Sequence, residues 1–211
     1  MPLILHKNIT NDCILGIWEM SENADELIQK LRITVNELAI YKKLSNQKKK
    51  LEWACSRMLL EQLTKRKDYQ IIHNEYRKPL IKNSSLNISV SHSYHYLTII
   101  ISPYETGIDI ELIQPKIKRV AEKFMNRDEL SSIGLDNHLE KLYIYWCSKE
   151  SLYKLYGKKK LLFKENISIA PFQYSQEGIV SGRIRIGFFD KSFQLKYEKI
   201  NQFMLVYILN S

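Results

Sequence analysis

The sequence lacks paired cysteines and long apolar segments. Its 211 residues include three cysteines, Cys13, Cys55 and Cys147, which lie far apart and form no Cys-x-x-Cys motif. An odd number of isolated cysteines predicts neither a disulfide framework nor a zinc cluster. No segment approaches the roughly 18 consecutive apolar residues of a membrane-spanning helix, and residues 1–7 are too short for the apolar core of a signal peptide. We therefore expect a cytoplasmic protein.

The composition is that of a folded globular chain. Hydrophobic residues make up 45% and charged residues 26% of the sequence, which excludes the disordered and fibrous classes. A chain of 211 residues buries a substantial core, either as one domain or as two small, closely packed halves.

The charge is strongly unbalanced. A formal net charge of +9 indicates an anionic partner, which leaves nucleic acid, a membrane surface, or an acidic protein with a phosphorylated ligand. The basic runs at residues 48–50, 65–67 and 158–160 are dispersed, and no groove-reading or base-stacking motif accompanies them. We expect no nucleic-acid partner, no membrane partner and a monomer.

Hydrophobic periodicity predicts mixed strands and helices in each half of the chain. In the first half we expect strands at residues 13–19, 70–74, 86–90 and 96–101, and helices at 23–31, 37–44 and 47–64. After a turn near Pro103, the second half is predicted to contain strands at 107–112, 167–169, 183–189, 193–199 and 203–209, and helices at 118–124, 127–132 and 139–156. This order predicts an α+β fold, each half a sheet packed against helices.

The segment Gly107-Ile-Asp-Ile-Glu111 alternates apolar and acidic residues. In a strand, Asp109 and Glu111 share one face, with side chains roughly 7 Å apart, close enough to share a cation. Taken alone, this pattern is more typical of a solvent-facing strand.

A second segment, Trp146-Cys-Ser-Lys-Glu-Ser-Leu-Tyr-Lys154, lies in a predicted helix. Trp146, Glu150 and Lys154 recur every four residues, so a helix carries all three on one face. Alone, Glu150 and Lys154 form an ordinary helical ion pair. Together the two segments place three carboxylates and a lysine at spacings that suit a magnesium-diphosphate site.

These two motifs, 35 residues apart, resemble the 4'-phosphopantetheinyl transferase superfamily, specifically its two-lobed surfactin-synthetase-type branch. The resemblance extends upstream to Arg57, to Lys78-Pro79 and to the segment Ser89-Val-Ser-His-Ser93, in the order that the family uses. Two positions depart from the family pattern: Arg77 stands where glycine usually precedes Lys-Pro, and Lys159 replaces a common glycine. Both departures lie beside the acidic motif rather than in it.

The resemblance implies two pseudo-symmetric lobes, each a mainly antiparallel sheet packed against helices. An N-terminal lobe at 1–103 precedes a C-terminal lobe at 104–211 that carries the metal site, with the active site between the lobes. The implied metal ligands are Asp109, Glu111 and Glu150, the implied catalytic residues are Glu150 and Lys154, and the implied coenzyme A contacts are Arg57, Lys78, Ser91, His92 and Lys154.

The activity implied is a magnesium-dependent transfer of 4'-phosphopantetheine from coenzyme A to a serine of an acidic apo acyl or peptidyl carrier protein, with release of 3',5'-ADP. Manganese is a possible substitute. A metal-dependent nuclease or phosphohydrolase remains an alternative, because it also needs clustered carboxylates, a lysine and a basic surface. A non-catalytic basic interaction module is the second alternative.

Overall fold

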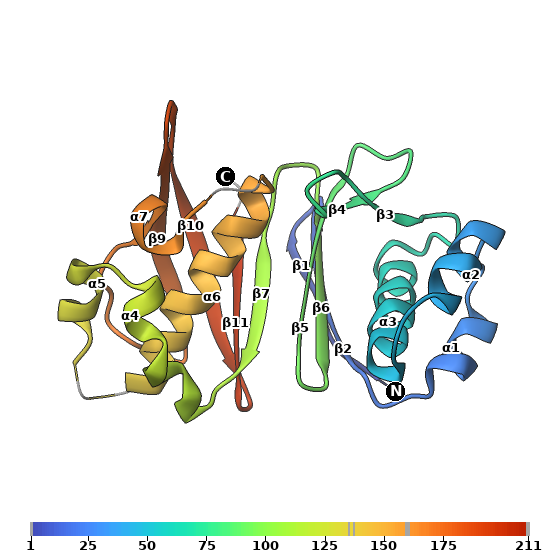
Figure 1. The fold of residues 1–211 in the computed structure, drawn as a ribbon, viewed down its shortest axis with the longest axis horizontal. Coiled ribbons are helices and arrows are strands. Elements are labelled where there is room, and N and C mark those ends of the chain that lie inside the picture. The colour runs from blue at the N-terminus through green and yellow to red at the C-terminus, as the bar shows by residue number, and fades with distance from the viewer. Residues whose placement is uncertain (1, 135, 137, 159–160, 210–211) are drawn as a thin grey trace. The chain divides into compact units, whose positions relative to one another are not determined.

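The computed structural model describes residues 2–134, 136, 138–158 and 161–209, and it divides into two compact units, Met1–Pro103 and Tyr104–Ser211. Each unit contains one antiparallel sheet with a long helix packed against it (Figure 1). The predicted α+β class with two antiparallel sheets is confirmed. Within the described helices, none combines the length and the apolar character needed to cross a membrane.

The first unit has a six-stranded sheet in the order β1-β2-β6-β5-β4-β3. Its helix α3 packs against the neighbouring strands β2 and β6. The elements are β1 (Leu3–Thr10), β2 (Cys13–Glu19), α1 (Ala24–Lys30), α2 (Val35–Lys42), α3 (Gln47–Thr64), β3 (Ile71–His73), β4 (Pro79–Ile81), β5 (Asn87–Ser93) and β6 (Tyr96–Ser102).

Helix α3 has local signals at both ends. The side chain of Asn46 accepts a hydrogen bond from the backbone of Lys49, which satisfies an amide of the first turn. Lys65 ends the helix in the left-handed conformation, with φ +57°. On the buried face, Leu59 and Leu63 lie one turn apart and pack over Gly16 of β2, where a Cβ atom would come within 2.8 Å of Leu63.

The second unit has a five-stranded sheet in the order β7-β11-β10-β9-β8, with helix α6 packed against β7 and β11. Its elements are β7 (Ile108–Leu112), the 3₁₀ helix η1 (Pro115–Arg119), α4 (Ala121–Phe124), α5 (Arg127–Ser132), α6 (His138–Tyr156), α7 (Phe163–Asn166), β8 (Ile167–Ile169), β9 (Glu177–Ile186), β10 (Phe189–Ile200) and β11 (Phe203–Leu209).

A fully buried lysine fixes helix α6 within this unit. Lys149 is 0% exposed, and its ammonium donates to the backbone oxygens of Phe124, Phe163 and Ile167 at 2.8–3.0 Å and pairs with Glu129 at 2.8 Å. Burial lowers the pKa of Lys149, and the Glu129 carboxylate opposes that effect. Because an unpaired buried charge is costly, this pair ties α6 to the segments that supply its acceptors.

The structure corrects several predicted boundaries. Strands β1 and β4 and the short helix α7 were not predicted. The predicted strand at 183–189 is wrong in its bounds, because Gly187 adopts φ +55° and the chain turns between β9 and β10. Lys159, one of the two departures from the family pattern, lies outside the described residues, as does Lys160 of the basic run.

Candidate functional site

The candidate site is built on a close approach between β7 and α6. A Cβ atom at Gly107, just before β7, would overlap the backbone carbonyl oxygen of Ser151 in α6. The hydroxyl of Ser151 donates to the carbonyl of Val206 in β11 at 3.0 Å, which holds the helix on the sheet. The glycine of the first motif and the serine of the second therefore meet, which brings Asp109, two residues after Gly107, close to the helical segment that carries Glu150, the residue before Ser151.

Strand β7 presents its acidic residues as the alternation predicts. Ile108 and Ile110 are fully buried, and Asp109 and Glu111 occupy the alternate positions. The expectation of an ordinary solvent-facing strand does not hold for Asp109, which is only 3% exposed. A carboxylate that is buried needs a compensating charge or hydrogen bonds.

Helix α6 supplies the compensating charge through Lys154, which lies on the predicted face with Trp146 and Glu150. The ammonium of Lys154 lies 2.8 Å from Asp109 Oδ1 and donates to the carbonyl of Ile108 at 3.0 Å. Glu150 lies one helical turn before Lys154, and its pKa is affected by the charges of Asp109, Lys154 and Glu111. The structure thus brings together Asp109, Glu111, Glu150 and Lys154, which we call the carboxylate cluster.

The carboxylate cluster carries more negative than positive charge. Burial and the negative charges of Asp109 and Glu111 together raise the pKa of Glu150 to about 7, although the positive charge of Lys154 opposes the shift. When Glu150 is ionised, the cluster holds three carboxylates and one ammonium, so its formal charge includes two excess negative charges. A divalent cation would neutralise them, and carboxylate oxygens are the ligands that magnesium prefers.

The described residues contain no three His, Cys, Asp or Glu side chains arranged as a metal site. The ion pair with Lys154 occupies one oxygen of Asp109, Oδ1. The carboxylate oxygens and the excess negative charge fit a magnesium ion. Because the side chains are not arranged as a metal site in this structure, the ligand set Asp109, Glu111 and Glu150 stays a prediction.

A pocket of about 360 Å³ lies beside Glu111 in the same unit. Its remaining lining residues, Lys116, Ile117, Arg119, Val120, Tyr143 and Trp146, combine an apolar interior with two basic side chains. Only Trp146 was singled out in the sequence. The four-residue spacing placed Trp146 on the same helix face as Glu150. The lining residues Lys116, Ile117 and Arg119 lie in the short 3₁₀ helix η1, which gives no periodic signal in the sequence.

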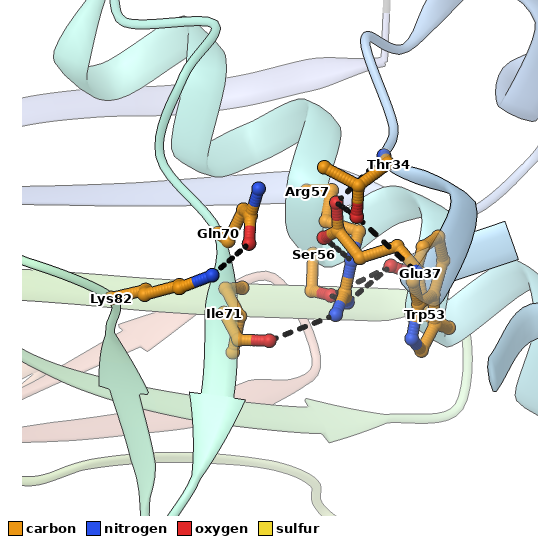
Figure 2. A network of polar contacts seen from close by, with 8 residues as sticks. All are labelled: Thr34, Glu37, Trp53, Ser56, Arg57, Gln70, Ile71 and Lys82. Atoms are coloured by element: carbon orange, nitrogen blue, oxygen red, sulfur yellow. Dashed lines mark hydrogen bonds and ion pairs between the residues drawn. The ribbon is translucent and has the colours of Figure 1, made fainter.

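The predicted site residues of the first unit are arranged differently. Figure 2 shows the guanidinium of Arg57 surrounded by groups of its own unit. It donates to Glu37 at 3.3 Å, to the carbonyl oxygens of Trp53 and Ile71 at 3.2 and 3.1 Å, and to the hydroxyl of Ser56, while its central carbon lies 3.4 Å from the Trp53 ring centroid.

Arg57 is 7% exposed, and burial lowers its pKa to about 10 against the opposing effect of Glu37. A phosphate would have to compete with Glu37 for this guanidinium. The geometry therefore favours a structural role for Arg57 over the expected contact with the 3'-phosphate of coenzyme A.

Lys78 follows a tight turn between β3 and β4. The side chain of Asn74 accepts from the backbone of Tyr76 and of Lys78 at 3.0 and 2.9 Å, and Arg77 between them has φ +67°. This left-handed conformation favours glycine, the residue that the sequence resemblance led us to expect at this position. The arginine keeps the turn at an energetic cost.

Ser91 and His92 lie on strand β5. Ser91 is buried, whereas the side chain of His92 is 45% exposed with Nδ1 3.4 Å from Glu52 of α3. Together with Lys78, these two residues stay predicted coenzyme A contacts.

The raised pKa of Glu150 predicts a pH-dependent stability difference. A folded-state pKa of about 7 against an ordinary value of 4.5 means that this group's contribution is fully present below about 4.5 and is lost as the pH rises through about 7. Glu150→Gln removes that loss, so without divalent cations we expect the variant to be more stable than the wild type by about 2–3 kcal/mol near pH 8 and nearly equal near pH 4. Urea unfolding at several pH values checks this, and a constant difference would contradict the charge coupling.

The Arg57 network predicts loss of stability rather than loss of ligand selectivity. Arg57→Ala leaves Glu37 as an uncompensated buried charge, so the free energy of unfolding should fall by about 3–5 kcal/mol. Arg57→Lys serves as the milder variant, because it keeps the charge and loses the forked contacts. The opposite result would be an Arg57→Lys variant that is as stable as the wild type but no longer prefers coenzyme A over dephospho-coenzyme A. That result would support the expected contact between Arg57 and the 3'-phosphate.

Comparison with known proteins finds similarity in the second half of the chain. A model of the 4'-phosphopantetheinyl transferase superfamily matches residues 105–203. The 4'-phosphopantetheinyl transferase gsp of Aneurinibacillus migulanus is 33% identical over 88 residues, which cover 40% of this chain and 37% of that protein. The 4'-phosphopantetheinyl transferase ffp of Bacillus subtilis is 31% identical over 107 residues, which cover 48% of this chain and 47% of that protein.

The matches to these two curated relatives thus span less than half the length of either protein. All four residues of the carboxylate cluster fall inside the region that the family matches. Over residues 105–203, this chain is thus similar to the 4'-phosphopantetheinyl transferase superfamily.

Proposed function

We propose that this protein is a magnesium-dependent 4'-phosphopantetheinyl transferase. It moves the 4'-phosphopantetheine group from coenzyme A to a serine of an apo acyl or peptidyl carrier protein and releases 3',5'-ADP. The observation that carries the proposal is the carboxylate cluster, in which Asp109, Glu111, Glu150 and Lys154 gather within the region matched by the family.

Asp109, Glu111 and Glu150 would hold the cation. Magnesium, for which manganese is a possible substitute, supplies positive charge to the diphosphate of coenzyme A when it is bound.

The residues of the chain perform the remaining steps. The serine oxygen of the carrier forms a bond to the pantetheine-side phosphorus while the bond from that phosphorus to the departing 3',5'-ADP breaks. Glu150, whose pKa lies near 7, is suited to accept the serine proton at neutral pH. Lys154 stabilises the negative charge that develops on the leaving oxygen.

The pocket beside Glu111 supports the choice of substrates. Its apolar interior suits a thin, uncharged arm such as pantetheine, and Lys116 and Arg119 at its lining would attract an acidic carrier surface. In the first unit, Lys78, Ser91 and His92 remain proposed contacts to the nucleotide part of coenzyme A.

The two alternatives account for fewer of these observations. A nuclease would also use clustered carboxylates, but an apolar pocket beside the cluster offers little to a charged sugar-phosphate backbone. A non-catalytic basic module does not explain why Asp109 is only 3% exposed or why the pKa of Glu150 is raised. In such a module the acidic side chains would be ordinary surface charges that stay solvated.

The direct test is the mass of an apo-carrier after incubation with coenzyme A, magnesium and this protein. We expect the wild type to add one phosphopantetheine group and Asp109→Asn to do so at least about a hundredfold more slowly, because a preorganised charge is lost. Asp68→Asn is the matched control: Asp68 is an exposed aspartate that pairs with Arg66 in the first unit, so its loss should leave the rate unchanged.

Two results would overturn the proposal. One is an unmodified carrier together with magnesium-dependent cleavage of nucleic acid, which would favour the nuclease. The other is equal modification by the wild type and by Asp109→Asn with its fold verified, which would remove the carboxylate cluster from the mechanism.

A further inference from the structure

The hairpin of β9 and β10 ends in an apolar apex. The register pairs Ile186 with Phe189, which leaves Gly187 and Phe188 as a two-residue turn. Gly187 has φ +55°, as expected for the first residue of a type II′ hairpin turn. This turn holds Phe188 at the tip, where it is fully exposed with a relative accessibility of 111%. Figure 1 shows the tip extending beyond the helices of its own unit.

Basic side chains surround this apex. Arg183 and Arg185 lie on β9, Lys191 lies on β10, and Lys158 shares a pocket with Lys191 and Phe189. The three hairpin positions are three to five residues from Phe188, which corresponds to roughly 10–17 Å along a strand, and the lower end of this range is close to the screening length of ~8 Å at physiological salt.

Two carboxylates partly offset these four cations. Asp190 pairs with Arg183 and with Arg185, and Glu105 lines the pocket that contains Lys158 and Lys191. Four cations against two carboxylates leave the apex with a net positive charge, which favours an anionic partner.

The size of the apex decides which anionic partner fits. A phenylalanine side chain buries about 150–250 Å², far less than the ~800 Å² per partner of a stable protein interface or the ~1,000 Å² of a specific nucleic-acid interface. A fluid lipid surface, in contrast, adapts to a projecting wedge, and aromatic rings favour the boundary between headgroups and acyl chains.

We propose that the β9–β10 hairpin docks this protein on an anionic lipid surface, with Phe188 entering the headgroup boundary and the surrounding lysine and arginine side chains facing the headgroups. The proposal involves no residue of the carboxylate cluster and stands apart from the proposed transferase activity. It revises the expectation of no membrane partner, because docking on a lipid surface needs no membrane-spanning segment.

Vesicle flotation of the full chain tests the docking. We expect binding to phosphatidylcholine vesicles that contain about 30% phosphatidylserine, weak binding to phosphatidylcholine alone, and loss of binding at high salt. Lys191→Gln should lower the partition coefficient about fivefold, the effect of one cation near such a surface, and Phe188→Ser by about as much or more.

Ile179→Ser is the matched control. Ile179 is also an apolar residue on β9 and is 56% exposed, but it pairs with Lys196 far from the turn, so its replacement should leave the partition unchanged. A second measurement reports on insertion itself: Phe188→Trp should be quenched by lipids brominated in their acyl chains, with the wild type, which has three tryptophans, giving the background.

Several outcomes would overturn the proposal. They are an unchanged partition of Phe188→Ser, equal binding to vesicles without phosphatidylserine, absence of added quenching in Phe188→Trp, and a preference for duplex DNA or an acidic protein over vesicles. None of these results depends on transferase activity, so a failure here is distinguishable from a failure of the proposed function.

Discussion

The geometry of the candidate site depends on the contact between the backbone of Gly107 and helix α6. Any larger residue at this position would overlap the carbonyl of Ser151, so the glycine lets strand and helix lie directly against each other. On the same helix, the buried ammonium of Lys149 binds three carbonyl oxygens and Glu129. Helix α6 is therefore fixed both by close packing and by a buried charge, and Glu150 and Lys154 are presented to Asp109 in defined positions.

This rigid frame holds charges that do not balance. Asp109 is paired with Lys154, and burial together with the charges of Asp109 and Glu111 raises the pKa of Glu150 to about 7. Stability alone does not favour such an arrangement, which is typical of functional sites. A cation that arrives with a diphosphate would find these carboxylates already close to one another, so part of the cost of gathering them is met during folding rather than during the reaction.

The sequence predicted the parts of the fold and the site that repeat at regular spacing. Periodicity located α3 and α6 to within a residue, and the four-residue spacing brought Glu150 and Lys154 onto one face. The turn at Gly187 was missed because apolar residues continue through it. The roles of Lys149 and Arg57 were not visible, because their partners, Glu129 and Glu37, each lie 20 residues away in the chain and meet them only after tertiary packing.

The central claim is that Asp109, Glu111 and Glu150 form one charge-coupled group that a divalent cation completes. Proton release on magnesium binding tests it most directly, measured by calorimetry with coenzyme A present, in buffers of different ionisation enthalpy. A group with a pKa of about 7 is half protonated near neutral pH, so the wild type should release about half a proton more than Glu150→Gln. Equal proton release by the two proteins, or magnesium binding that neither needs Asp109 nor involves Glu150, would contradict the account.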